Sequence, residues 1–449
     1  MAQGKFGRRR FLKQVGLAGA GLTLAALADA SPMMAGPVPS PTSRGTRALR
    51  LQLISHFVAG YDDWIRNFAV DWGRRRGIRV TVDFITNLDV SARGAVEVAA
   101  QKGHDIVQWD LAVSSPFLWK SHMVNLTGVV KEIEARSGKF SNVGVQAGFD
   151  PATGVWFSLP IFYMAFPALY RKDLWDQVGG APETWDRVLE GGRRLKAMGT
   201  PVGIPISRGS DANVNWRGLI WSFGGAIQDR DQQVVVNSRE VVEAVRFARA
   251  LYREAMTDEV LSWDDTGNNR FLASGKGSLI FNPISAYRSI QASDRVLADK
   301  IFVAKPPQGS RGRWMGVTAH AWTIWRFAEN QLNAIEFMRH FVANYGGSFE
   351  TSGGYNMPMN PGWLPNPIPL LSHDPTSNPP DKLSVLQTAP EWCAAFEYPG
   401  PNNPAMGEVV SSFIIPDMIA MAATDRTSPE EAVAWAEGQI QRIVGKWRS

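Results

Sequence analysis

Cysteine and clustered metal ligands are almost missing from this sequence. Cys393 is the only cysteine among the 449 residues, so the chain can form neither an internal disulfide nor a thiolate metal cluster. Beside Trp392, this thiol is most simply a small buried side chain. The six histidines are scattered, and no pair has the spacing of metal ligands on one helix face.

Nucleotide and catalytic motifs are missing as well. The sequence contains no G-x-G-x-x-G after a strand, no G-x-x-x-x-G-K-[ST] and no H-E-x-x-H, each of which would indicate a cofactor or metal site. G-x-S-x-G and S-x-x-K nucleophile motifs are also absent. We therefore expect no cofactor and no metal, and we assign no catalytic residue.

An excess of basic charge is missing from the body of the chain. The formal net charge is +5, but residues 1–30 contain five basic residues and one acidic residue. The remainder is nearly balanced, with 42 basic and 41 acidic residues. The basic pI thus results mainly from the N-terminal residues and gives no reason to expect nucleic-acid binding.

The N-terminus has the layout of a secretory signal. A basic head precedes the apolar segment 15–28, which is short for a bilayer span, and Ala28-Asp29-Ala30 resembles a cleavage site. Arg8-Arg9-Arg10-Phe11-Leu12-Lys13 matches the twin-arginine export signature R-R-x-F-L-K. We predict a twin-arginine signal peptide over residues 1–30 and a flexible leader over 31–46. No cysteine follows the apolar segment, so no lipid anchor is expected there, and we expect a periplasmic protein.

From Leu49 the chain alternates strand and helix patterns. LRLQLIS, IRVTVDF and HDIVQWD are strand-like, and residues 61–76 and 92–102 between them have helical periodicity. This β-α-β-α-β order predicts a parallel sheet covered by helices. Ligands of such sheets bind at the carboxyl ends of the strands, which here are His56, Thr86 and Asp110 with their neighbours.

Residues 159–169 interrupt this pattern with Pro160, Pro167 and several aromatic residues. Because proline fixes φ and lacks an N–H donor, we predict an extended crossing between two lobes, neither helix nor central strand. Its aromatic side chains would then face an interlobe ligand site. A core strand whose aromatic residues merely pack is the alternative.

A series of motifs in constant order resembles one family. LYRKDLW at 169–175 and PETWD at 182–186 are followed by FGGAI at 223–227, VVNS at 235–238, FLASGKGSL at 271–279 and NAIEF at 333–337. This order is similar to that of the family 1 extracellular solute-binding proteins, over roughly residues 49–354. Met315-Gly316 and Ser278-Leu279 depart from the family pattern, which affects details of the pocket more than the fold.

The resemblance implies a fold class, a function and partners. The fold would be α/β, the periplasmic binding protein fold, with two lobes joined by hinge crossings and a ligand cleft between them. We expect lobe 1 over 47–162 and 282–345, and lobe 2 over 163–281 and 346–449. The protein would be the monomeric substrate-binding component of an ABC importer that delivers a carbohydrate to membrane permease subunits, and not an enzyme.

Ligand-binding candidates follow from strand ends, the crossing and polar loops. Aromatic faces suit the apolar face of a sugar ring, and polar side chains suit its hydroxyls. The loop SRGSDANVNW at 207–216 and the segment after SLIFN supply most of the polar candidates. The full set is His56, Trp109, Asp110, Tyr163, Asp211, Asn213, Asn215, Trp216, Asn282, Ser285, Tyr287, Trp314, Tyr355 and Trp363.

Two other functions stay open. A periplasmic carbohydrate-active enzyme would need two carboxylates in the cleft, and Asp110 and Asp211 could meet there. A metal or polyamine binder would need clustered acids or paired tyrosines, which the sequence does not show.

Overall fold

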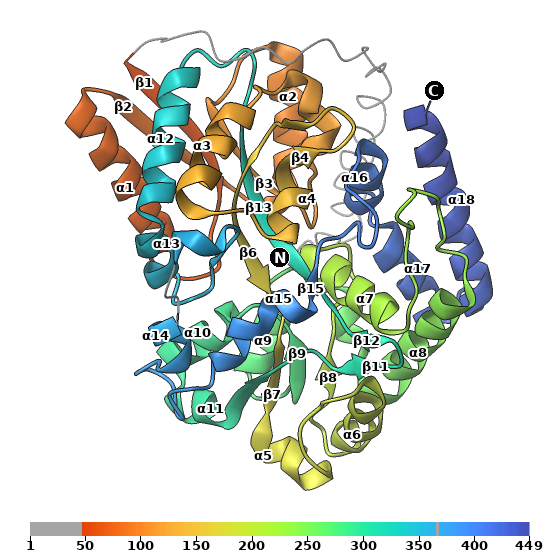
Figure 1. Ribbon diagram of the computed structural model, residues 1–449. Coiled ribbons are helices and arrows are strands. Elements are labelled where there is room, and N and C mark those ends of the chain that lie inside the picture. The colour runs from red at the N-terminus through yellow and green to blue at the C-terminus, as the bar shows by residue number, and fades with distance from the viewer. Residues whose placement is uncertain (1–46, 365–367, 449) are drawn as a thin grey trace, which may run out of the picture. The chain divides into compact units, whose positions relative to one another are not determined.

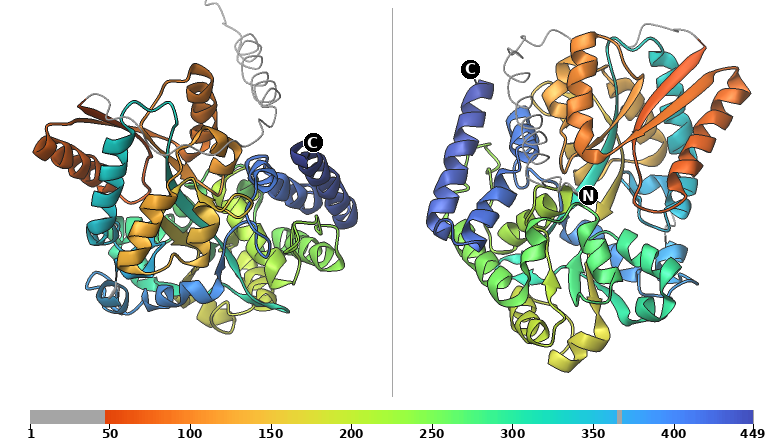
Figure 2. Two further views of the ribbon diagram at one scale, coloured as in Figure 1. Left: turned by 45° about the horizontal axis from the view of Figure 1, so that its top comes forward. Right: turned by 180° about the vertical axis from the view of Figure 1, so that it is seen from behind.

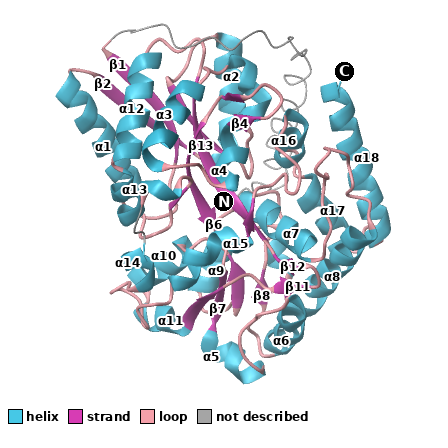
Figure 3. Ribbon diagram, viewed as in Figure 1, coloured by secondary structure: helices cyan, strands magenta, loops and turns pink. Residues whose placement is uncertain are grey.

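The computed structural model describes residues 47–364 and 368–448, which belong to one compact unit. The predicted signal peptide and the whole of the predicted leader lie outside the described residues. Figure 1 shows the element order, and Figure 3 shows the strands flanked by helices.

The first five elements follow the predicted alternation. They are β1 (Ala48–Ile54), α1 (Tyr61–Arg76), β2 (Arg79–Ile85), α2 (Val90–Ala100) and β3 (Ile106–Asp110). β1 pairs in parallel with β2 on one side and β3 on the other. This confirms the predicted parallel sheet, whose strand ends all lie at one edge.

Two antiparallel strands extend this sheet. β13 (Met315–Ile324) pairs with β3, and β6 (Leu159–Ala165) pairs with β13. β14 (Met357–Pro358) and β15 (Cys393–Ala394) complete a sheet of seven described strands.

The prediction that residues 159–169 contain no central strand is wrong. β6 lies between β13 and β14 and is buried along its whole length. The register shifts where Ala321 pairs with Pro160 and His320 pairs with Phe162. A bulge of this kind accommodates a proline that cannot donate to the ladder.

The crossing itself is present just after β6. β7 (Ala168–Arg171) belongs to a second sheet, with order β10-β7-β9-β8, so the chain passes between the sheets at Phe166-Pro167. The other strands of this sheet are β8 (Val202–Gly203), β9 (Leu279–Phe281) and β10 (Ile301–Ala304).

Helices surround both sheets, and two of them begin at serine caps. The Ser238 hydroxyl accepts a hydrogen bond from the Val241 amide at the start of α8, and Ser428 and Glu431 cap each other at the start of α18. The longer helices after β3 are α3 (Thr127–Ser137), α6 (Trp185–Ala197), α7 (Ser210–Ser222), α8 (Arg239–Ala255), α10 (Ser285–Ser293), α12 (Gln331–Ala343), α16 (Pro404–Ser411), α17 (Ile414–Ala423) and α18 (Pro429–Arg448). Shorter ones are α4 (Asn142–Gly148), α5 (Lys172–Trp175), α9 (Gly267–Ala273), α11 (Arg295–Lys300), α13 (Tyr345–Thr351), α14 (Ile368–Ser372) and α15 (Ala389–Trp392).

The remaining elements are small. Two short hairpins pair β4 (Phe149–Asp150) with β5 (Val155–Trp156), and β11 (Gln308–Gly309) with β12 (Gly312–Arg313). The 3-10 turns are η1 (Asn87–Asp89), η2 (Pro116–His122), η3 (Asp176–Val178), η4 (Asp258–Leu261), η5 (Pro361–Trp363) and η6 (Ser384–Thr388).

The C-terminal helices α16, α17 and α18 pack on one another, with α17 and α18 also against α8, as both views of Figure 2 show. No single helix in the described part of the chain is long and apolar enough to cross a membrane, although α16 and α17 together meet that criterion across a 42° bend. Cys393 is buried, as its neighbourhood predicted.

Strand pairing differs from the expected lobe boundaries at four places. β10, expected in lobe 1, pairs with β7 of the second sheet. β14, β15 and residues 163–165 of β6, all expected in lobe 2, pair within the first sheet. These segments belong with the opposite sheet, because backbone pairing groups strands that are distant in sequence.

Candidate functional site

A narrow cavity lies where the carboxyl ends of the parallel strands face the second sheet. Its walls come from the residues after β1, β2 and β3, from β13, from the first turn of α7 and from the segment after β9. In this conformation it has room for little more than a water molecule. A sugar ring is larger than that, so a ligand can enter only after the walls separate.

Three carboxyl groups line this cavity: Asp110, Asp211 and Asp265. Asn87 connects two of them, since its amide nitrogen donates to Asp110 Oδ2 at 3.2 Å and to Asp265 Oδ2 at 3.0 Å. Asn268 donates to Asp211 Oδ2 at 2.5 Å. The bond from Asn87 to Asp265 spans the cavity from η1, next to the first sheet, to the loop before α9.

Burial makes all three carboxyl groups harder to ionise. Loss of hydration raises the pKa of Asp110 to about 7 and raises the pKa of Asp211 well above its usual value. The pKa of Asp265 is also raised, first by burial. Mutual repulsion adds to the effect, because Asp265 acts on both Asp110 and Asp211.

Two histidines in the same cavity are neutral. Burial lowers the pKa of His56 to about 4 and that of His320 to about 3. His320 Nδ1 accepts from the Gln108 amide at 2.6 Å, while Gln108 Oε1 accepts from the Ile54 N–H at 3.4 Å. The ring proton of His320 is therefore on Nε2, which faces Asp110 at 3.9 Å.

His56 has the same tautomer for a similar reason. Its Nδ1 accepts from the Val58 N–H at 3.0 Å, and its Nε2 donates to Asn356 Oδ1 at 3.0 Å. The ring packs edge-on against Tyr355, with centroids 4.9 Å apart. Together with Phe57 and Phe166, Tyr355 gives the cavity aromatic surface beside its hydrogen-bonding groups.

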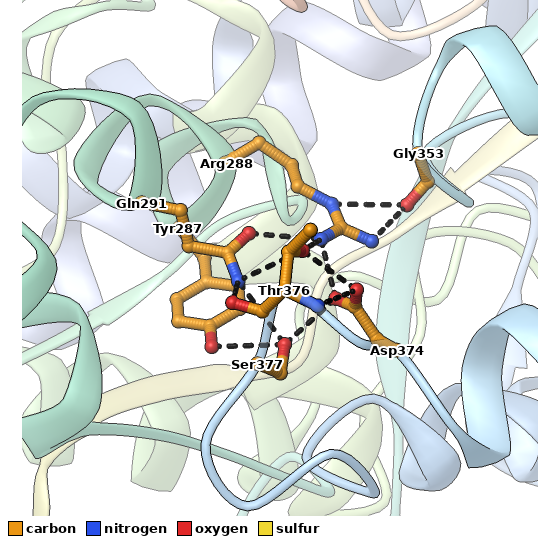
Figure 4. Close-up of polar contacts among 7 residues, drawn as sticks. All are labelled: Tyr287, Arg288, Gln291, Gly353, Asp374, Thr376 and Ser377. Carbon is orange, nitrogen blue, oxygen red and sulfur yellow. Dashed lines mark hydrogen bonds and ion pairs between the residues drawn. The ribbon is translucent and has the colours of Figure 1, made fainter.

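A dense polar network holds the turn that carries Tyr355 (Figure 4). Arg288 on α10 donates to the Gly353 carbonyl and forms an ion pair with Asp374 at 2.5 Å. Asp374 also accepts from Ser377, whose hydroxyl in turn accepts from Tyr287 at 3.0 Å. The network thus ties α10, whose first residue Ser285 lines the cavity, to the turn preceding Tyr355.

The structure brings six predicted site residues to the cavity, and their role in binding stays a prediction. They are His56, Asp110, Asp211, Asn282, Ser285 and Tyr355. The other eight are not among the lining residues.

Strand alternation removes Trp109 and Tyr163 from the cavity. Asp110 and Met164 line it, so their neighbours in sequence point to the opposite face of the sheet. Trp109 instead donates to Thr323 Oγ1 at 2.8 Å and packs on Trp325.

The expectation of a polar loop at 207–216 is wrong from Ser210 onward, because α7 begins there. Asn213, Asn215 and Trp216 lie inside this buried helix, where their side-chain nitrogens donate to the carbonyls of Ala112, Phe281 and Pro205. Three further candidates also have partners away from the cavity lining. Tyr287 bonds Ser377, Trp314 packs on Tyr398, and Trp363 packs on Tyr345.

Sequence reasoning missed several polar lining residues. Asn87 stands two positions beyond the end of β2 and could have been found by extending the strand-end rule. Asp265 lies in the polar segment WDDTGNN, and His320 lies inside β13; neither has a local signal, because distant pairing places them. The structure also brings clustered acids together, which the sequence did not show. No group of three or more potential ligands within 47–364 and 368–448 is arranged to hold a metal ion.

This architecture, with two α/β sheet regions and a polar cavity at the strand ends, defines a small-molecule binding protein. The chain belongs to the family described as bacterial extracellular solute-binding protein, whose sequence profile matches residues 59–344. That family consists of substrate-binding proteins of ABC transporters that act outside the cytoplasm. No curated protein matches the chain in sequence.

Solved structures share the fold. Maltose-bound MalE3 of T. maritima superposes with a TM-score of 0.75 at 19% identity, covering 88% of this chain and 99% of that one. A solute-binding protein of Agrobacterium radiobacter K84 in complex with ribitol gives 0.72 at 17% identity, covering 90% and 100%. A sugar transporter protein of Arthrobacter chlorophenolicus A6 with bound laminaribiose gives 0.73 at 16% identity, covering 88% and 99%. The periplasmic binding protein fold is thereby established.

Proposed function

We propose that this protein captures a sugar, oligosaccharide or polyol in the cavity and delivers it to the permease of an ABC importer. The observation that carries the proposal is the composition of the cavity. Carboxyl, amide and imidazole groups there can donate hydrogen bonds to hydroxyls and accept hydrogen bonds from them. They lie beside the aromatic surface of Tyr355, Phe57 and Phe166. Sugars or a polyol bound to the similar structures of 16–19% identity support the same class.

Capture requires the two cavity walls to separate and close again. In this conformation Asn87 bonds Asp265 across the cavity, and outside it Asn213 Nδ2 on α7 donates to the Ala112 carbonyl after β3 at 2.9 Å. A ligand that contacts both walls would stabilise the closed form only by its differential affinity for it. The hinge would include Phe166-Pro167, where the chain passes between the sheets, since a few element-terminal residues absorb such motions.

The wider assignments belong to this proposal. The protein would act as a monomer in the periplasm, without a cofactor, after export by the twin-arginine route. Its two lobes would follow the expected division, with 301–304 moved to lobe 2 and with 163–165, 357–358 and 393–394 moved to lobe 1. The strand pairing supports these changes.

Thermal unfolding of the mature protein against mono-, di- and oligosaccharides and sugar alcohols tests the proposal. At ~100 times its dissociation constant, a ligand should add about 2.7 kcal/mol of stability. Recovery of the sugar unchanged supports transport binding; its conversion would establish the enzyme alternative instead. No shift with any member of the panel would contradict the proposed substrate class.

A further inference from the structure

The side chains that line the cavity can supply negative charge but no compensating positive charge. Asp110, Asp211 and Asp265 line it, and its lining residues include no lysine or arginine. Both lining histidines are held as neutral tautomers by their hydrogen bonds to Val58 and Gln108. The carboxyl groups therefore face no cationic side chain within the cavity.

Two buried polar side chains in the lining, His320 and Asp211, each have one polar atom without a hydrogen-bond partner among the described residues. The His320 side chain is 6% exposed, and its Nε2 has no hydrogen bond among the described residues, with Asp110 at 3.9 Å. Asp211 is 5% exposed, and within the described residues only its Oδ2 has a side-chain donor, Asn268. One donor and one acceptor are thus open to a ligand, and buried polar groups of this kind normally have partners.

Keeping three carboxyl groups in a desolvated space is costly unless they are protonated or paired with a cation. Asn87 and Asn268 supply neutral donors only. The N-terminus of α7 adds a partial positive charge beside Asp265. Asp265 Oδ1 accepts a weak hydrogen bond there from the Asp211 N–H, at 3.4 Å. That partial charge is smaller than one unit and cannot balance three carboxylates.

We propose that the solute is an amino sugar or an amino polyol whose ammonium group lies among Asp110, Asp211 and Asp265. This inference rests on the proposed carbohydrate-binding function and narrows its substrate class. The ammonium group supplies the missing positive charge with three donors for carboxylate oxygens. Hydroxyls of the same molecule accept from His320 Nε2 and bond Ser285, which a polyamine without hydroxyls cannot do.

The experiment compares matched ligand pairs by titration calorimetry on the mature protein. Glucose, galactose and mannose are each set against their 2-amino and 2-acetamido forms, and sorbitol against 1-amino-1-deoxysorbitol. Putrescine and spermidine serve as amines without a sugar skeleton. Each ligand that binds is measured at pH 7 in two buffers of different ionisation enthalpy, which reports protons released on binding.

We expect at least one free amine to bind ten-fold or more tightly than both its neutral and its acetylated counterparts. Binding should release a fraction of a proton, because the incoming cation lowers the pKa values of the carboxyl groups. Equal or tighter binding of the neutral sugar, without proton release, would overturn this inference and leave the proposed function intact. Binding of putrescine or spermidine alone would contradict both. Binding of nothing in the panel would overturn this inference, while thermal unfolding with di- and oligosaccharides would still decide the proposed function.

Two variants test whether the charge of the cavity acids causes the preference for the amine. Asp265→Asn and Asp211→Asn should each lose most of the preference for the amine over its neutral counterpart. Asp186→Asn is the matched control, since this exposed acid on α6 lies outside the cavity. A preference that survives both cavity substitutions would overturn the inference. Should either variant fail to fold, the preference and the proton release of the unaltered protein still decide it.

Discussion

The dependence of stability on pH offers the sharpest test of the buried acid cluster. Asp110 has its pKa raised from 3.8 to about 7 by burial. Its folded form binds more protons than its unfolded form between these values, so stability falls as pH rises through this range. From pH 5.5 to pH 8, Asp110 alone should remove about 2 kcal/mol from the free energy of unfolding.

Asp110→Asn isolates this contribution. The amide retains an oxygen for the Ala112 N–H, which now donates to Asp110 Oδ1 at 2.9 Å, but it turns an NH₂ group toward Asn87. That mismatch costs about 1–3 kcal/mol at every pH, so it cancels when one variant is compared at two pH values. We therefore expect the variant to lose about 2 kcal/mol less than the unaltered protein between pH 5.5 and pH 8.

The assay is urea unfolding without ligand at half-unit pH steps. His56 and His320 act in the opposite direction: with pKa values lowered to about 4 and about 3, they favour the folded state as pH rises toward 6.5. Both histidines are present in the variant and in the unaltered protein, so their contribution cancels in the comparison. Parallel stability curves for the two proteins would refute the raised pKa of Asp110.

Three further substitutions probe the support of the site and the packing of the chain. Arg288→Ala should destabilise the protein by about 3 kcal/mol, because it leaves the Asp374 carboxylate buried without its cationic partner. It should also weaken ligand binding in calorimetry by freeing the turn before Tyr355, and Arg288→Lys serves as the milder control. Unchanged affinity would contradict the positioning role of Arg288. Gly438→Ala lies in the middle of α18, with open space around the added methyl group. Because alanine favours the helix over glycine, the free energy of unfolding should rise by about 0.5–1 kcal/mol in the same urea assay. A loss of stability would show that the methyl group meets a steric clash. Gly362→Ala should prevent normal folding or lower the melting temperature severely, since its Cβ would lie 1.7 Å from the Ser137 carbonyl oxygen; a neutral effect would show that this turn can move away.

Local sequence patterns determined the order of the secondary structure and most of the strand ends. Periodicity predicted β1 to β3 and the helices between them, because one buried face per element leaves a repeating pattern in the sequence. The strand-end rule then found His56 and Asp110. Spaced motifs further along identified the family, because turns and helix starts tolerate few residue types.

Tertiary structure decided which of the candidate side chains meet. Trp109 and Asp110 are adjacent in sequence, yet the pleat of β3 sends only Asp110 to the cavity. Asn213 and Trp216 looked like loop residues but fell inside α7, since the polar pattern of a buried helix resembles that of a loop. His320 and Asp265 carry no local signal, because strand pairing across about 200 residues and the docking of a distant loop bring them to Asp110. The acid cluster is thus a property of the fold: its members are separated by up to 155 residues in sequence, and only packing places them in one desolvated space.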